Sequence, residues 1–94
     1  MEEKLTQLEK CWLVALYSDG YRYIARDLNN DLYAYDKKPE WNNEEDYWDI
    51  DDEYRTDGIP ERLFKYIPKG NKGLFEISCK AIYIDHIDLV RYEE

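Results

Sequence analysis

Histidine, cysteine, proline and glycine are all scarce in this chain of 94 residues, which has one, two, three and four of them. A cysteine–histidine nucleophile would have to join His86 to Cys11 or Cys79, and a lone histidine in a turn is more typical of a solvated polar residue. Gly70 and Gly73 lack the Gly-Lys-Ser or Gly-Lys-Thr ending of a phosphate-binding loop. The sequence therefore contains no catalytic motif, and we expect neither an enzyme nor a bound cofactor.

Long hydrophobic runs are also absent. No stretch of 18 apolar residues is present, so no segment is expected to span a membrane as a helix. The first residues do not combine a basic start with an apolar stretch, as a secretory signal does. Two cysteines are too few for a disulfide framework. We expect a cytoplasmic protein with two reduced, buried thiols, and a disulfide between Cys11 and Cys79 is the alternative.

Clusters of lysine and arginine are missing as well, although the chain has 13 of these residues against 22 acidic ones. A nucleic-acid-binding protein needs clustered cations to displace counterions from phosphates, so direct binding to DNA or RNA is not expected. Residues 40–57 contain nine acids and one base, Arg55, a net charge of −8. The other 76 residues hold 13 acids and 12 bases, a net of −1. Almost the whole charge of −9 thus belongs to one short segment.

Apolar side chains are plentiful by contrast, at 44% of the chain, and they include ten tyrosines and three tryptophans. This content is enough for one modest core in a chain of this length. Tyrosine combines a large rigid surface with a polar tip, which suits half-buried sheets and interfaces. With no repeat or long linker to divide the chain, we expect a single domain over residues 1–94, with an acidic, aromatic segment at residues 40–58.

The N-terminal part has the pattern of a helix. Thr6 and Glu9 have the spacing of a capping box, and Gly20 can adopt the left-handed conformation that ends many helices. Between them, apolar residues recur at helical spacing, which predicts a helix over residues 7–17. Its buried face is expected to include Leu8, Cys11, Trp12, Ala15 and Leu16. Leu13, Val14 and Tyr17 widen this face, so we expect the helix to be covered on more than one side.

Two strand-like runs follow, at residues 21–27 and 32–36. The Asn- and Asp-rich stretch between them predicts a β-hairpin, and Pro39 should end its second strand because proline cannot donate to a ladder. One face of the first strand carries Arg22 and Arg26 and is only half apolar. We therefore expect one side of this hairpin to contact solvent or a partner.

The C-terminal half shows weaker strand signals. Residues 70–73 predict a turn, and residues 74–79 alternate as a strand does. Residues 81–84 and 87–92 are further candidate strands. A short turn is expected in residues 59–64. Residues 47–50 could form a short strand, but the charge around them favours a loop or a sheet edge. The predicted fold class is α+β, with one N-terminal helix packed on a small antiparallel β-sheet and with four to six short strands in the whole chain. The core is expected to include Trp12, Leu16, Ile24, Phe75 and Ile77.

The acidic segment invites a metal hypothesis first. Asp49, Asp51, Glu53, Arg55 and Asp57 recur at every second residue, as at the start of a calcium loop. The match then fails, because Tyr54 stands where that loop needs glycine, Arg55 brings a cation among the ligands, and Pro60 replaces the closing Glu. Paired carboxylates could also serve a glycosidase, which needs a groove on a larger scaffold. We expect no specific metal site, and a small metal-binding domain or metal-dependent hydrolase remains the alternative.

The same segment favours a surface that imitates nucleic acid. Carboxylates along a folded edge can occupy a basic groove that evolved for phosphates, and tryptophan and tyrosine can supply short-range anchors. Two other interpretations stay open: a solvated acidic loop whose aromatic rings fold back onto the core, and a structural or virion interaction module. The predicted partner-binding residues are Glu40, Trp41, Glu44, Glu45, Asp46, Tyr47, Trp48, Asp49, Asp51, Asp52, Glu53, Tyr54 and Asp57.

The runs YSDGYRYIARD (residues 17–27) and LYAYDKKPEW (residues 32–41) point to a family. They resemble small acidic proteins encoded by phages and prophages of Gram-positive bacteria, most of which have no assigned function. Those proteins carry a similar aromatic–arginine strand, a turn, a Lys-Pro pair and a Tyr-Trp acidic stretch. Asn30-Asp31 stands here where we would expect Asp-Gly. The resemblance covers residues 12–50.

The resemblance implies an accessory role in a bacterial host cell. Phage proteins of this size and acidity often inhibit host machinery that handles nucleic acid, such as CRISPR effectors, restriction enzymes and repair glycosylases. We therefore expect a non-enzymatic inhibitor of the anti-CRISPR or another anti-defence type, a monomer or homodimer in the host cytoplasm. Its expected partner is a basic, nucleic-acid-binding host protein, with no direct contact to nucleic acid or membrane.

Overall fold

The computed structural model describes residues 5–49, 55–70, 73–79 and 87–92. Within these ranges the chain forms one helix and seven strands, and no helix there is long and apolar enough to cross a membrane. The elements are α1 (Gln7–Ser18), β1 (Tyr23–Arg26), β2 (Leu32–Tyr35), β3 (Glu40–Asn42), β4 (Tyr47–Asp49), β5 (Thr56–Ile59), β6 (Leu74–Cys79) and β7 (Ile87–Arg91).

Five of the strands form an antiparallel sheet in the order β5-β2-β1-β6-β7, while β3 and β4 form a separate two-stranded sheet. The predicted α+β fold with an N-terminal helix on an antiparallel sheet is confirmed. The predicted number of strands, four to six, is too low. Two strands, β3 and β5, lie where no strand was predicted, and Asp57 and Gly58 of β5 belong to residue types depleted in strands.

Helix α1 begins and ends where local signals place it. The hydroxyl of Thr6 accepts a hydrogen bond from the Glu9 N–H at 3.1 Å, and the Glu9 carboxylate accepts one from the Thr6 N–H at 2.9 Å. These two hydrogen bonds form a capping box, which provides acceptors for two backbone N–H groups at the start of the helix. Gly20 lies just beyond the C-terminal end with φ at +96°, the left-handed conformation that glycine adopts without strain.

The buried face of α1 differs from the predicted one. Glu9, Leu13 and Leu16 are buried, whereas Leu8 is 50% exposed and Cys11 is also exposed. Apolar residues lie on more than one side of this helix, so spacing alone could not choose among them. The face that is buried follows from Glu9, because its carboxylate must reach a buried backbone N–H in a distant loop. The expectation of two buried thiols is likewise wrong, because Cys11 is exposed and Cys79 is only partly buried.

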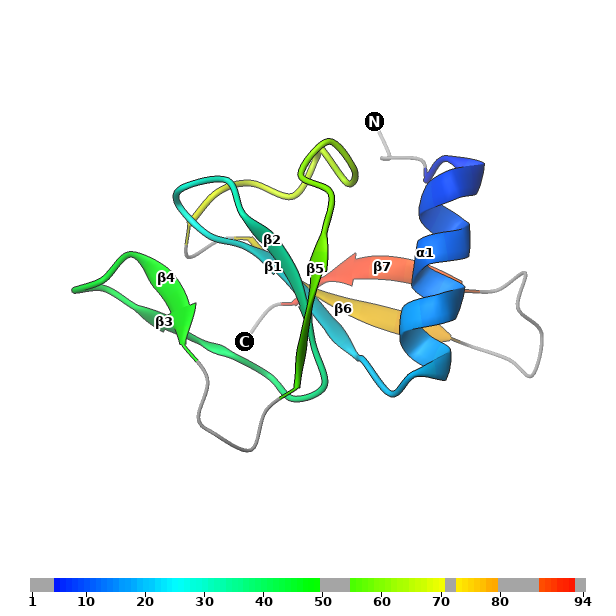
Figure 1. Ribbon diagram of the computed structural model, residues 1–94, viewed down its shortest axis with the longest axis horizontal. Helices are drawn as coiled ribbons and strands as arrows, with labels where there is room; N and C mark the ends of the chain where they lie inside the picture. The colour runs from blue at the N-terminus through cyan, green and yellow to red at the C-terminus, as the bar shows by residue number, and fades with distance from the viewer. Residues whose placement is uncertain (1–4, 50–54, 71–72, 80–86, 93–94) are drawn as a thin grey trace.

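The five-stranded sheet has a hydrophobic cluster on each face. Helix α1 packs against β7 on one face, over the larger cluster that contains Ile24, Phe75 and Ile77. The β3–β4 hairpin projects on the other side of the sheet (Figure 1) and contributes to the smaller cluster of Ala25, Tyr35, Trp48 and Leu74. Of the five predicted core residues, four are buried, and Trp12 is only partly buried against the larger cluster.

Strand β6 occupies the predicted residues, and β7 covers most of its predicted range. The expected turns are also present, with hydrogen bonds of 3.0 Å from the Gly73 N–H to the Gly70 carbonyl and from the Leu63 N–H to the Pro60 carbonyl. A Cβ atom at Gly73 would lie 2.1 Å from the Pro68 carbonyl oxygen, so only glycine fits there. The predicted strand at residues 81–84, His86 and Asp85 lie outside the described residues.

Arg26 lies on the face of β1 that was expected to be half solvated, and it is buried with 3% of its surface exposed. Its guanidinium donates to the backbone carbonyls of the loop that follows β5 and to Asn30 at 2.9 to 3.2 Å. The carbonyls of that loop belong to Glu61, Leu63, Phe64 and Ile67. Arg26 therefore does not face solvent, because backbone oxygens satisfy the buried cation, whereas Arg22 on the same face is only partly buried.

Phe64 is held from both sides by buried charged side chains. Its N–H donates to the Glu9 carboxylate, and its carbonyl accepts from Arg26 at 3.1 Å. Its φ is +52°, a left-handed conformation that costs energy for a bulky residue, and its side chain is fully buried in the larger cluster. The two hydrogen bonds and the burial together compensate this strain.

Replacing Arg26 with Met should lower the free energy of unfolding by about 3 to 5 kcal/mol, because four loop carbonyls, three of them in buried hydrogen bonds, lose their donor. The matched control is Arg62→Met at an exposed site, which should change stability by less than about 0.5 kcal/mol. Urea unfolding followed by circular dichroism measures both. Equal midpoints for the two variants would show that the contacts of Arg26 do not stabilise the fold.

Candidate functional site

The first half of the acidic segment is a folded hairpin, which we call the acidic hairpin and define as residues 40–49. Strands β3 and β4 pair in antiparallel register, with Trp41 opposite Trp48. The side chain of Asn42 closes the turn by accepting from the N–H groups of Glu44 and Glu45 at 3.0 and 3.1 Å. Carboxylates in this hairpin therefore have a defined backbone rather than a flexible loop beneath them.

The acidic hairpin combines five carboxylates with no lysine or arginine. All five are exposed, and two of them, Glu40 and Asp49, stand directly opposite each other across the β3–β4 pair. Like charges in this position destabilise a sheet. The five exposed carboxylates are Glu40, Glu44, Glu45, Asp46 and Asp49.

The predicted partner-binding residues do not all lie together at the surface. Tyr47 is 38% exposed, Trp41 is partly buried, and Trp48 is buried with 7% exposed. Asp57 is exposed on β5, an edge strand of the five-stranded sheet. The placement of four predicted residues lies outside the described part of the chain, namely Asp51, Asp52, Glu53 and Tyr54.

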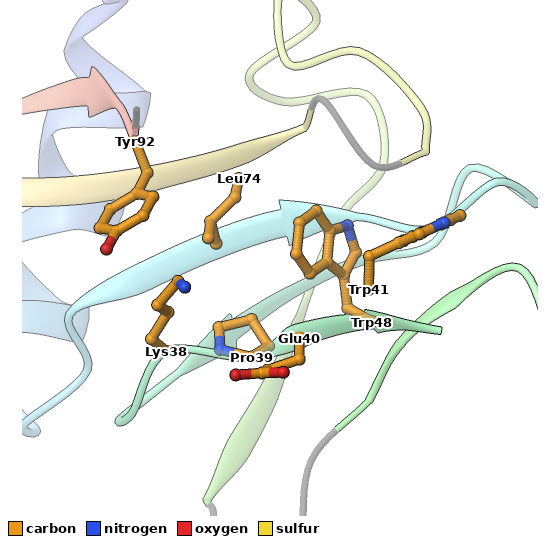
Figure 2. A pocket seen from close by; sticks show the side chains of 7 residues that line it. All are labelled: Lys38, Pro39, Glu40, Trp41, Trp48, Leu74 and Tyr92. Carbon is orange, nitrogen blue, oxygen red and sulfur yellow. The ribbon is translucent and has the colours of Figure 1, made fainter. Parts of the chain in front are cut away.

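Trp48 joins the acidic hairpin to the main sheet. Its ring packs with Ala25, Tyr35 and Leu74, and meets the Trp41 ring edge to face, with centroids 5.4 Å apart and planes at 69°. Its indole nitrogen has no hydrogen-bond partner, and Figure 2 shows the nitrogen-bearing edge on the side of Trp41. Trp48 is thus mainly a packing residue, and little of its surface is exposed to a partner.

A cavity of about 350 Å³ opens between the acidic hairpin and the sheet (Figure 2). One ammonium and one carboxylate lie among its apolar walls, and the Lys38 ammonium is 4.9 Å from the centre of the Tyr92 ring. Tyr92 in turn contacts Tyr23 edge to face at 6.2 Å. This lining combines apolar contact area with the charged groups of Lys38 and Glu40 and the phenol of Tyr92. The lining residues are Lys38, Pro39, Glu40, Trp41, Trp48, Leu74 and Tyr92.

This cavity had no counterpart in the sequence predictions. Its walls come from the β2–β3 connection, the acidic hairpin, the start of β6 and the residue after β7. No local pattern relates Leu74 or Tyr92 to Trp48. The high tyrosine and tryptophan content was the only available signal, and it indicated an interface or half-buried sheet without a location.

Asp27 connects the acidic hairpin to the turn after β1. One oxygen of its carboxylate accepts a hydrogen bond from the Trp48 N–H at 2.9 Å, across 21 positions of sequence. Burial raises the pKa of Asp27 above its ordinary value of 3.8, the hydrogen bond from Trp48 opposes this, and the nearby charge of Asp31 adds to the increase. The carboxylate is therefore partly desolvated at the junction of two segments.

No group of three or more side chains that could hold a metal ion occurs among the residues that the structure describes. The alternating carboxylates that suggested a calcium loop run from Asp49 to Asp57, and Asp51, Asp52 and Glu53 lie outside the described residues. The expectation of no specific metal site at this loop, and the alternative of a metal-binding domain, both stay predictions to be tested by titration with divalent ions.

Replacing Trp48 with Ala should lower the free energy of unfolding by about 3 to 5 kcal/mol, since a large buried ring is lost. The control is Tyr47→Ala, its exposed neighbour on β4, which should cost less than about 1 kcal/mol. Thermal and urea unfolding measure both values. A similar small cost for the two variants would contradict the assignment of Trp48 as a packing residue.

Replacing Asp27 with Asn should leave the protein at least as stable as the parent at neutral pH. The Asn carbonyl can still accept from the Trp48 N–H, while the cost of burying a charge disappears. Because the folded-state pKa of Asp27 is raised, the folded state binds more protons than the unfolded state between 3.8 and that higher pKa. The contribution of Asp27 to stability therefore falls as pH rises through this window.

The measurement is urea unfolding of parent and Asp27→Asn from pH 3 to pH 7. The stability of the variant relative to the parent should grow as pH rises above 3.8 and level off beyond the folded-state pKa. A variant that loses stability relative to the parent with rising pH would show that the ionised carboxylate is favourable at this junction.

The chain matches no protein-family model, no curated protein and no solved structure. Functional inference therefore depends on the geometry of the acidic hairpin and its surroundings.

Proposed function

We propose that this chain is a non-enzymatic accessory protein of the phage type that binds a basic, nucleic-acid-handling host protein and inhibits it. The binding surface is the acidic hairpin, which presents carboxylates to a groove built for phosphates. The observation that carries the proposal is the set of five exposed carboxylates on a short folded hairpin without a single basic residue. An anti-defence role, as for anti-CRISPR proteins, is the form of this function that the phage resemblance supports.

The fixed backbone of the acidic hairpin supports binding over simple solubility. A loop that only keeps a protein soluble needs no closed turn, whereas Asn42 closes this turn and Asp27 and Trp48 attach the hairpin to the sheet. A surface held in place before binding loses less entropy when a partner docks.

Charge at this density also affects how fast a partner associates. An acidic surface attracts a basic groove over distances of about 8 to 10 Å at ordinary ionic strength, which raises the association rate and makes it sensitive to salt. Contacts to apolar surface mainly affect dissociation. Imitation of nucleic acid therefore predicts that loss of carboxylates slows association, whereas loss of apolar contacts speeds dissociation.

The test begins with capture of the partner from a host lysate on immobilised protein, followed by kinetics of the purified pair. Neutralising Glu40, Glu44, Glu45 and Asp46 to their amides should slow association about tenfold or more at low salt and flatten its salt dependence. Asn is also well tolerated at position 46, where φ is +59°.

A matched control removes four exposed acids elsewhere, at Asp19, Glu61, Glu76 and Asp88. Both variants have the same net charge, so the control should associate nearly as fast as the parent if the acidic hairpin is the binding surface. A DNA or RNA oligonucleotide should compete with the protein for the captured partner. Equal association rates for the two variants, or a partner that nucleic acid does not displace, would rule out imitation by this hairpin.

A further inference from the structure

A second cavity, of about 500 Å³, lies between the turn after β1 and the tip of the acidic hairpin. It is distinct from the cavity beside Tyr92, and we call it the Leu28–Tyr47 cavity. Its walls carry carboxylates, an amide and two large apolar side chains, with no lysine or arginine among them. The lining residues are Asp27, Leu28, Asn29, Glu45, Asp46 and Tyr47.

The two apolar side chains distinguish this cavity from an ordinary acidic surface. Leu28 is 49% exposed and Tyr47 is 38% exposed, and they are two of the four large hydrophobic side chains exposed in the described part of the chain. The other two, Leu8 and Val90, line none of the described cavities. Exposed apolar side chains gathered at one cavity are typical of an interaction site.

The cavity has a defined shape because its two walls are joined. The Trp48 N–H donates to the Asp27 carboxylate at 2.9 Å, which ties the hairpin to the turn after β1. That turn is closed by hydrogen bonds from the Asn30 N–H to the Asp27 carbonyl and from the Asp27 N–H to the Asp31 carbonyl, at 3.0 and 2.8 Å. Because both walls are held in place before a ligand binds, binding loses less entropy, which favours affinity.

We propose that the Leu28–Tyr47 cavity receives an arginine side chain of the basic partner. The proposal rests on the function proposed above and names the side chain that the acidic hairpin recognises. The aliphatic stem of the arginine packs against Leu28, and the guanidinium lies against the Tyr47 ring within reach of the carboxylates. The carboxylates that complement its charge belong to Asp27, Glu45 and Asp46.

The chemistry of the cavity selects an arginine over other cations. A metal ion gains nothing from Leu28 or Tyr47, because hard divalent cations bind oxygen ligands and retain water. A lysine ammonium is more strongly hydrated and offers a single point charge. The planar guanidinium stacks on an aromatic ring and donates two parallel hydrogen bonds to a carboxylate. The partial desolvation of Asp27, seen in its raised pKa, strengthens its attraction to such a cation.

The probes are hexa-arginine and hexa-lysine peptides, titrated into the protein at low salt and followed by backbone amide NMR shifts. Hexa-arginine should bind about threefold or more tightly than hexa-lysine, and the amides of Leu28, Asn29 and Tyr47 should shift most. Leu28→Ser and Tyr47→Ser should each weaken hexa-arginine about threefold, and Tyr47→Ser should remove most of the preference for arginine.

Leu8→Ser is the matched control, because Leu8 is exposed to the same extent as Leu28 but lies on α1. It should bind both peptides as the parent does. Dispersed amide spectra confirm that each serine variant remains folded, as expected for exposed positions.

The outcomes separate this proposal from the proposed function. Leu28→Ser and Tyr47→Ser are compared with Leu8→Ser and with the variant neutralised at four acids. If the two cavity variants bind hexa-arginine as tightly as Leu8→Ser does, while the neutralised variant loses binding, the cavity proposal fails and the acidic hairpin still binds basic peptides. Shifts of the same amides with protein concentration alone would assign the cavity to a second copy of the chain and overturn the proposal. If the neutralised variant binds hexa-arginine as tightly as the parent, both proposals fail.

Discussion

The peptide groups on either side of Phe64 are the point on which the larger core depends. Glu9 from α1 accepts the Phe64 N–H, and Arg26 from β1 donates to the Phe64 carbonyl. These contacts join the helix, the sheet and the loop after β5, and they hold Phe64 at a positive φ with its ring fully buried. A buried charge is costly unless its hydrogen bonds are satisfied, so the two charged side chains and the loop backbone require one another.

Charges in this protein therefore serve two separate purposes. Glu9 and Arg26 are buried and saturated by backbone groups, and they determine the fold. The carboxylates of the acidic hairpin are exposed and lie on the opposite face of the sheet, where they face solvent. Asp27 is intermediate, since it is partly buried and bonds to the hairpin backbone while it also lines the Leu28–Tyr47 cavity. The acidic hairpin can thus evolve for binding without disturbing the larger core.

Several elements were predictable from the sequence because their causes are local. The capping box of Thr6 and Glu9 marks the start of α1, Gly20 marks its end, and alternation of residue types marks β6. Each signal lies within a few residues of the structure that it specifies. The concentration of acids at residues 40–57 likewise indicated a candidate surface, although burial of Trp48 removes one of its predicted anchors.

By itself, then, the sequence determined the α+β class, the main helix, four of the seven strands in the described part of the chain and the location of the negative charge. Only the tertiary structure decided which face of α1 is buried, that Arg26 organises a loop, and that Leu28 and Tyr47 share a cavity. The physical reason is distance along the chain. Arg26 and Ile67 are 41 residues apart and Glu9 and Phe64 are 55 apart, and no pattern confined to a few neighbouring residues can encode such contacts.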